Sequence, residues 1–167
     1  NKLKARGALT AEASISQLDF PDASFDLLCA LDIIEHVDDD EGALAELSRV
    51  AAEGAVLLMS TPLHPAWWTP FDDFVGHRRR YKPDELVALL ARHGFVVSQS
   101  AVFGMKPKSS LLVDIGMWFL QHRRQRAMWW YNRVLPFTVR FQKPLQLLPG
   151  LIPADDIAEV FLVCKRV

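Results

Sequence analysis

The chain has 167 residues, of which 50 % are hydrophobic and 23 % are charged, and its formal net charge is −1. This length allows one domain with a sizeable core, and the composition excludes an intrinsically disordered chain. The near-neutral charge argues against a nucleic-acid-binding protein, and no stretch reaches the ~18 apolar residues that a membrane span needs. Cys29 and Cys164 both lie in apolar runs, so we expect buried, reduced thiols of a cytoplasmic protein.

The first elements in chain order form a strand–helix–strand unit. The first ten residues resemble the tail of a helix that enters a strand, and residues 25–31 and 54–60 are continuous apolar runs. Such runs are typical of strands covered on both faces, as in a parallel sheet. Apolar residues recur at helical spacing between these two runs, and acidic residues precede them at 38–41. A right-handed crossover is therefore predicted.

The later elements are a helix, two strands and a segment of different composition. Pro83 suits the first turn of a helix that ends at Gly94, and strands are predicted over 95–103 and 157–164, paired with each other. Residues 105–153 are rich in arginine, lysine and tryptophan. We expect two or three helices there, broken near three prolines: Pro136, Pro144 and Pro149. The predicted organisation is a partial domain over 1–104 and 154–167 with a helical insertion over 105–153.

Four short motifs follow one another in a specific order. Residues 18–26 read LDFPDASFD, residues 31–37 read LDIIEHV, residues 54–62 end in STP, and residues 75–81 read VGHRRRY. In this order and spacing they resemble the methyltransferase type 11 family of class I S-adenosylmethionine-dependent methyltransferases. The resemblance covers about residues 8–104 and 157–166, and it places the second motif after the fourth strand of the family's sheet.

The resemblance implies an α/β fold: a Rossmann-like methyltransferase sheet with a helical insertion before the last strand. It also implies an enzyme that uses S-adenosylmethionine as its cofactor. The family's first strand and its G-x-G-x-G loop have no counterpart in this sequence. We therefore expect an N-terminally truncated sheet with exposed edges, a longer natural protein, and little cofactor binding by this chain alone.

Ligands of open parallel sheets bind beyond the carboxyl ends of the strands. By resemblance, the cofactor is expected to contact five residues: Ser14, Ile15, Leu31, Asp32 and His36. His36 and His77 are the candidate catalytic residues, since a neutral imidazole can accept a proton from a hydroxyl acceptor. Many relatives work mainly by placing the acceptor in line with the sulfonium methyl group. Asp38–Asp40 are interpreted as an acidic helix cap, and no metal is expected.

Six residues are candidates for binding the methyl acceptor: His64, Trp68, Arg78, Arg79, Arg80 and Tyr81. Guanidinium groups bind phosphate or carboxylate with two hydrogen bonds, which favours an anionic acceptor. The alternative is a solvated face in which one arginine bridges to Asp72 or Asp73. The aromatic residues before this motif form either a lid over the acceptor or a satellite core.

The insertion over 105–153 has three interpretations. Its apolar residues cap the sheet and the acceptor pocket, or they form a homodimer interface. In the third, basic and tryptophan-rich helices lie on an anionic bilayer, peripherally at the inner membrane face. The expected function is methyl transfer to a small-molecule or lipid-linked acceptor. A non-catalytic methyltransferase-like binding or assembly module is the alternative, and a nucleotide-sugar or NAD-dependent Rossmann protein is a second one.

Overall fold

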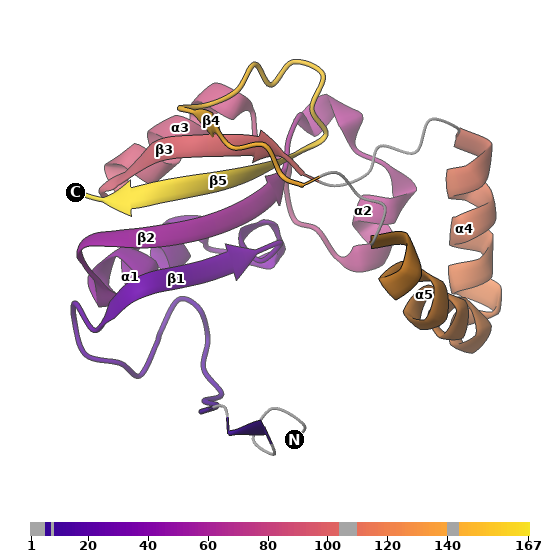
Figure 1. The fold of residues 1–167 in the computed structure, drawn as a ribbon, viewed down its shortest axis with the longest axis horizontal. Coiled ribbons are helices and arrows are strands. Elements are labelled where there is room, and N and C mark those ends of the chain that lie inside the picture. The colour runs from indigo at the N-terminus through magenta and orange to yellow at the C-terminus, as the bar shows by residue number, and fades with distance from the viewer. Residues whose placement is uncertain (1–5, 8, 104–109, 140–143) are drawn as a thin grey trace.

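A computed structural model of the chain describes residues 6–7, 9–103, 110–139 and 144–167. Figure 1 shows one sheet with helices beside it. The strands are β1 (Phe25–Leu31), β2 (Ala51–Pro62), β3 (Phe95–Val102), β4 (Leu148–Pro149) and β5 (Glu159–Arg166). The α-helices are α1 (Asp40–Val50), α2 (Pro70–Val75), α3 (Pro83–Arg92), α4 (Ser110–His122) and α5 (Arg124–Val139). Two 3-10 helices complete the list, η2 (Ile34–His36) and η3 (Pro65–Trp67).

The strand order in the sheet is β1-β2-β5-β3-β4. β1 and β2 are parallel, as the strand–helix–strand prediction requires. β5 lies antiparallel between β2 and β3, so the predicted pairing of the last two long strands is confirmed. β4 was not predicted, and it pairs with β3 through Ser100 opposite Leu148. The result is the predicted α/β sheet, in which the carboxyl ends of β1 and β2 share one edge.

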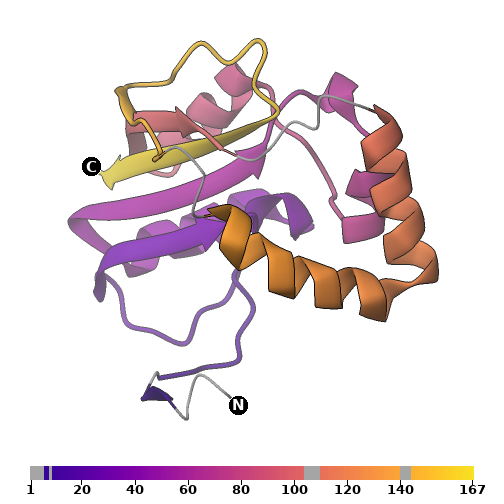
Figure 2. The same ribbon diagram turned by 45° about the vertical axis from the view of Figure 1, so that its right-hand side comes forward.

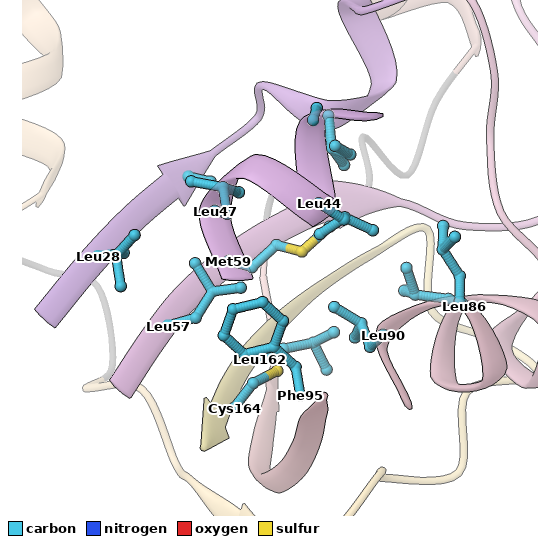
Figure 3. Packing of buried hydrophobic residues seen from close by; sticks show 14 of the residues in the cluster. Leu28, Leu44, Leu47, Leu57, Met59, Leu86, Leu90, Phe95, Leu162 and Cys164 are labelled. Carbon is cyan, nitrogen blue, oxygen red and sulfur yellow. The ribbon is translucent and has the colours of Figure 1, made fainter. Parts of the chain in front are cut away.

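The core lies on one face of the sheet, between the strands and the helices α1 and α3. Figure 3 shows Leu44 of α1 and Leu90 of α3 packed toward Leu57 and Met59 of β2. All four side chains have no exposed surface. Burial also accounts for Cys164, whose thiol pKa is raised to about 12 because burial disfavours the thiolate. The helices therefore cover one side of the strands.

Burial of β1 on both faces was expected, and that prediction is wrong. Leu28 and Ala30 are buried, whereas Leu27, Cys29 and Leu31 between them are exposed. Successive side chains of a strand point to opposite faces, and the described helices α1 and α3 lie against only one of them. Cys29 is thus an exposed thiol, contrary to the sequence-based expectation.

Local sequence signals set the ends of the helices. The Asp39 side chain caps α1 by accepting a hydrogen bond of 2.8 Å from the Gly42 amide, which agrees with the acidic cap predicted at 38–40. Pro83 begins α3, and Gly94 follows its end with φ 73°. This left-handed conformation favours glycine. The two helices that cover the core therefore begin and end where the sequence predicts.

Two helices of the predicted insertion, α4 and α5, lie at the carboxyl-end edge of β1 and β2 (Figures 1 and 2). Both views show α4 and α5 beside this edge and away from the core face (Figures 1 and 2). α5 continues past Pro136, where a break was predicted. Residues 105–109 and 140–143 of the insertion lie outside the described residues. No helix among the described residues is long and apolar enough to cross a membrane.

The segment before β1 differs from the prediction. Residues 9–13 have no regular secondary structure, and Ser14 and Gln17 form an isolated bridge. No neighbouring strand of the described sheet lies beside them to complete a ladder. The rest of the predicted helix-to-strand entry falls on residues 1–5 and 8, outside the described residues. Arg49 of α1 holds the following turn through hydrogen bonds to Asp22 and to the Leu18 carbonyl.

The one-sided core makes a testable distinction between neighbouring leucines. Leu57→Ala removes a side chain with no exposed surface and is expected to lower the free energy of unfolding by about 3 kcal/mol. Leu27→Ala, on the adjacent strand with 57 % exposure, is the matched control and should cost less than about 1 kcal/mol. Urea unfolding of the complete protein, followed by circular dichroism, measures both. Equal losses would contradict the one-sided core.

Candidate functional site

The loop after β1 is fastened to β2 at the sheet edge. The Asp32 amide donates to Ser60 Oγ at 3.0 Å, and Ser60 Oγ donates in turn to Asp32 Oδ1 at 2.6 Å. Ser60 has no exposed surface. Asp32 has φ 51°, a left-handed conformation that non-glycine residues rarely adopt and that occurs often at functional sites. The Ser60 hydroxyl therefore fixes the point at which the chain leaves β1 and turns into η2.

Glu35 of η2 places a buried carboxyl group directly behind this loop. Its side chain has no exposed surface; Oε2 accepts a long hydrogen bond of 3.4 Å from Thr61, and the backbone carbonyl accepts one from the Arg78 amide. Oε1 accepts no hydrogen bond from the described residues. Burial raises the pKa of Glu35 to about 7, because a desolvated carboxylate is costly.

Glu159, at the start of β5, adds a second carboxyl group, which is half-buried. The register that pairs Pro62 with Glu159 brings it to the edge where β1 and β2 end. Burial and then the negative charge of Asp32 raise the pKa of Glu159 to about 7. Several acidic groups therefore lie at this edge, and their negative electrostatic potential favours a cationic ligand.

His36 and His77, which are 41 positions apart in the sequence, meet in the structure. Their ring centroids are 4.8 Å apart with an edge-to-face orientation. His36 Nδ1 lies 3.1 Å from the Gly76 carbonyl oxygen, and His77 Nδ1 lies 2.8 Å from Asp72 Oδ1. Because both oxygens are acceptors, each Nδ1 carries a hydrogen, and each neutral ring keeps its lone pair on Nε2. The structure thus brings together both candidate catalytic residues and holds each ring through its Nδ1 atom.

Asp72 of α2 holds His77 and the chain around it. This side chain has no exposed surface, and it accepts hydrogen bonds from the Thr69 amide and hydroxyl and from two nitrogens of Arg80 at 2.8 and 3.0 Å. Burial by itself raises the pKa of Asp72, but hydrogen bonds from Arg80, Thr69 and His77 outweigh it and bring the pKa to about 2. Asp72 is therefore an ionised carboxylate, and both of its oxygens accept hydrogen bonds.

The basic motif over 78–81 is mostly engaged within the protein. Arg80 bonds to Asp72 and to the Leu63 carbonyl, which is the bridge named in the alternative interpretation of this motif. The Asp40 carboxylate forms an ion pair of 2.9 Å with the Arg79 guanidinium. It also accepts a hydrogen bond of 2.8 Å from the hydroxyl of Tyr81, which is buried. The Arg78 side chain is 57 % exposed and lies 3.3 Å from an exposed carboxylate of Asp38. Of this motif, Arg78 is the residue most accessible to a ligand.

The remaining candidate residues lie on loops near the same edge or before β1. His64 follows β2 with φ 61°; its Nε2 lies 2.7 Å from the Ala154 carbonyl and its ring 4.2 Å from that of Trp67. Trp68 is 39 % exposed and donates to Asp73. Leu31, at the end of β1, is exposed. Ser14 and Ile15 lie in the segment before β1, where Ile15 packs partly against the core.

Sequence reasoning did not select several residues of this site as site residues, among them Ser60, Asp72 and Glu159. Asp72 was considered only as an arginine partner, and Glu159 was not considered at all. An acidic residue at the start of an otherwise apolar strand, VFLVC, is the signal that could have identified Glu159. Its place at the edge depends on the antiparallel register of β5, which local sequence patterns do not specify.

Comparison with known proteins places this geometry in context. Residues 1–59 match the family model of a methyltransferase domain. A probable S-adenosylmethionine-dependent methyltransferase of Mycobacterium tuberculosis (strain H37Rv) is 36 % identical over 89 residues, which are 51 % of this chain and 32 % of that protein. Ajmaline N-methyltransferase of Rauvolfia serpentina is 38 % identical over 47 residues, 28 % of this chain and 16 % of the relative. The chain thus spans at most about a third of these relatives.

Solved structures share the fold over nearly the whole chain. A methyltransferase of Thermotoga maritima superposes with a TM-score of 0.63 at 17 % identity, covering 98 % of this chain and 67 % of that one. The [4+2]-cyclase SpnF superposes with a TM-score of 0.58 at 16 % identity, covering 99 % and 59 %. At these identities the likeness concerns the fold. The Rossmann-like methyltransferase sheet expected from the sequence is therefore confirmed.

The Asp72 network predicts a large loss of stability on neutralising one carboxylate. Asp72→Asn leaves Arg80 buried without its charged partner and is expected to lower the free energy of unfolding by about 3 kcal/mol. Asp73→Asn, on the exposed side of the same helix, is the control and should change it by less than about 0.5 kcal/mol. Urea unfolding of the complete protein compares the two; a stable Asp72→Asn variant would contradict the network.

Proposed function

Because residues 1–59 of this chain belong to a methyltransferase domain family and the chain has the matching fold, we propose that the protein transfers a methyl group from S-adenosylmethionine to an acceptor. The observation that carries the proposal is the Asp32–His36 loop at the carboxyl end of β1, held in place by Ser60. In open α/β sheets this edge is where ligands bind. The acidic groups there suit the positive charge of a sulfonium.

The residues of this edge divide into those that hold the cofactor and those that face the acceptor. Leu31, Asp32 and His36 would contact the cofactor, and Ser14 and Ile15 would reach its adenine. His36 belongs to both groups, because it would also face the acceptor. When bound, S-adenosylmethionine supplies a methyl group on a positively charged sulfur. Exposed Leu31 offers an apolar surface beside the fixed Asp32 carboxylate. These residues therefore fit a ligand that combines an apolar ring with a positive charge.

The histidines would act on the acceptor. His36 and His77 each keep an Nε2 lone pair, so either ring can accept the proton that a hydroxyl acceptor loses as it is methylated. The Asp72 carboxylate keeps His77 in this form and stabilises the ring when it becomes positively charged. His64, Trp68 and Arg78 would position the acceptor, while Arg79, Arg80 and Tyr81 would support the loop through Asp40 and Asp72.

Cofactor binding tests this proposal directly. Isothermal titration of S-adenosylhomocysteine into the complete protein is expected to show one site, and Asp32→Asn should weaken it by about tenfold through loss of a charged contact. Asp26→Asn, an exposed residue at the other end of β1, is the matched control and should bind like the unaltered protein. Absence of binding to the complete protein would overturn the proposal and favour a non-catalytic binding module. Because a [4+2]-cyclase shares the fold, methyl transfer itself must be measured after binding.

The acceptor is proposed to be a small or lipid-linked molecule. A relative named for N-methylation of ajmaline favours a small organic acceptor. The helices α4 and α5 favour an acceptor held at a membrane surface. Trp118, Trp129 and Trp130 expose at least half of their surface, and exposed arginines lie beside them at 123, 124 and 126. Tryptophan and arginine together suit the headgroup region of an anionic bilayer.

Binding to vesicles tests the proposed membrane contact. Co-sedimentation with phosphatidylserine-containing vesicles is expected for the complete protein, and it should weaken in phosphatidylcholine alone. The double variant Arg124→Gln/Arg126→Gln should lose about 1 kcal/mol per charge, or roughly 30-fold in partitioning. Lys82→Gln/Arg92→Gln removes two exposed charges elsewhere and serves as the control. If instead Trp129→Ala lowers the molecular mass of the protein in solution from dimer to monomer without affecting vesicle binding, α4 and α5 form a homodimer interface.

A further inference from the structure

We propose that Glu35, His36 and His77 form a binding site for a divalent transition-metal ion, with Zn²⁺ as the best match. One ligand atom from each residue lies within 4.8 Å of the others. Two imidazoles and one carboxylate are donors that Zn²⁺ and its neighbours in the first transition row prefer. The inference does not depend on methyl transfer: while the ion is bound, the Nε2 lone pairs of both histidines are its ligands and do not accept a proton. The sequence could not point to this site, because the ligands come from two separate segments.

The hydrogen bonds of both histidines prepare them as ligands. Histidines that bind a metal almost always donate their other N–H to a carboxylate or a backbone carbonyl, which fixes the ring and raises its basicity. His77 donates Nδ1–H to Asp72 at 2.8 Å, and His36 donates Nδ1–H to the Gly76 carbonyl at 3.1 Å. Both supporting patterns are therefore present, and both Nε2 lone pairs remain available.

The Glu35 carboxylate supplies an independent observation. It is completely buried, and its Oε1 accepts no hydrogen bond from the described residues. The facing nitrogen, His77 Nε2, is 4.0 Å away, too far for a hydrogen bond. Buried polar atoms are nearly always satisfied, and a buried atom without a hydrogen-bond donor is often the ligand of a bound ion. A cation between Glu35 Oε1 and the imidazole would satisfy both groups.

The spacing fits a site that tightens when the ion enters. Tetrahedral Zn²⁺ with bonds of about 2.0–2.1 Å places its ligand atoms about 3.3 Å apart. The distance of 4.0 Å between His77 Nε2 and Glu35 Oε1, in a cluster whose ligand atoms lie within 4.8 Å of one another, therefore requires small side-chain movements toward the ion. Backbone contacts such as Arg78 N–H to the Glu35 carbonyl, 2.7 Å, already hold the two segments together. Three protein ligands leave a fourth position open for an oxygen ligand.

Metal binding is tested on the complete protein after treatment with a chelator. Titration with Zn²⁺ in competition with a chromogenic chelator is expected to give one ion per chain. His77→Gln and Glu35→Gln should each weaken binding at least 100-fold. Co²⁺ in the same site should produce visible absorption bands typical of four-coordination, which His77→Gln abolishes. His93→Gln is the matched control: His93 also pairs with a carboxylate, that of Glu41, but outside the three-residue cluster.

Two further measurements separate this inference from folding and from cofactor binding. Circular dichroism of each variant shows whether it is folded, and His36→Gln provides a second ligand change if His77→Gln is not. Titration of S-adenosylhomocysteine in the same samples reports the cofactor site separately. Less than one ion per chain, or the same affinity in His77→Gln and His93→Gln, would overturn the metal site whatever the cofactor result.

Discussion

The site depends on the hydrogen bonds and the ion pair that the buried carboxylate of Asp72 forms. This carboxylate joins the start of α2, the imidazole of His77 and the guanidinium of Arg80. A desolvated negative charge is tolerated only with several good donors, so each donor is held in position as firmly as the charge itself. The orientation of His77, and through it the contact with His36, is therefore a consequence of satisfying Asp72.

The same electrostatic logic divides the acidic residues of the site into two kinds. Asp72 meets a guanidinium and stays ionised. Glu35 is buried and Glu159 is half-buried, both with fewer compensating donors, so their pKa values rise to about 7. Identical functional groups a short distance apart thus differ in charge at neutral pH because their partners differ. This difference gives the edge both fixed negative charge and groups that can exchange protons.

The sequence predicted those parts of the fold that local patterns encode. The apolar run at 25–31, the cap at Asp39 and the sequence Pro83 to Gly94 each locate an element within a few residues. The one-sided burial of β1 could not be read in the same way, because a continuous apolar run looks alike whether one face or both are covered. β4 was missed because two residues containing a proline carry no strand signal, and Ser100 holds it through contacts distant in sequence.

For the site, the sequence identified residues better than it identified roles. His36 and His77 stood out from motifs, and the structure brings them together. Arg80 and Tyr81 stood out equally, yet they bond to Asp72 and Asp40 inside the protein. The difference is the position of a carboxylate partner in space, and linear spacing does not encode it. A cluster of arginines has the same sequence pattern in both cases. Its side chains can pair with carboxylates inside the protein or remain accessible to a ligand.

The exposed face of β1 has a practical consequence. Cys29 lies on that face between Leu27 and Leu31, whereas Cys164 is enclosed in the core with a raised pKa. The two thiols should therefore differ sharply in their rate of alkylation, because only an accessible thiolate reacts. Cys29 is a natural probe: slow labelling in the complete protein would reveal that another segment or molecule shields this side of the sheet.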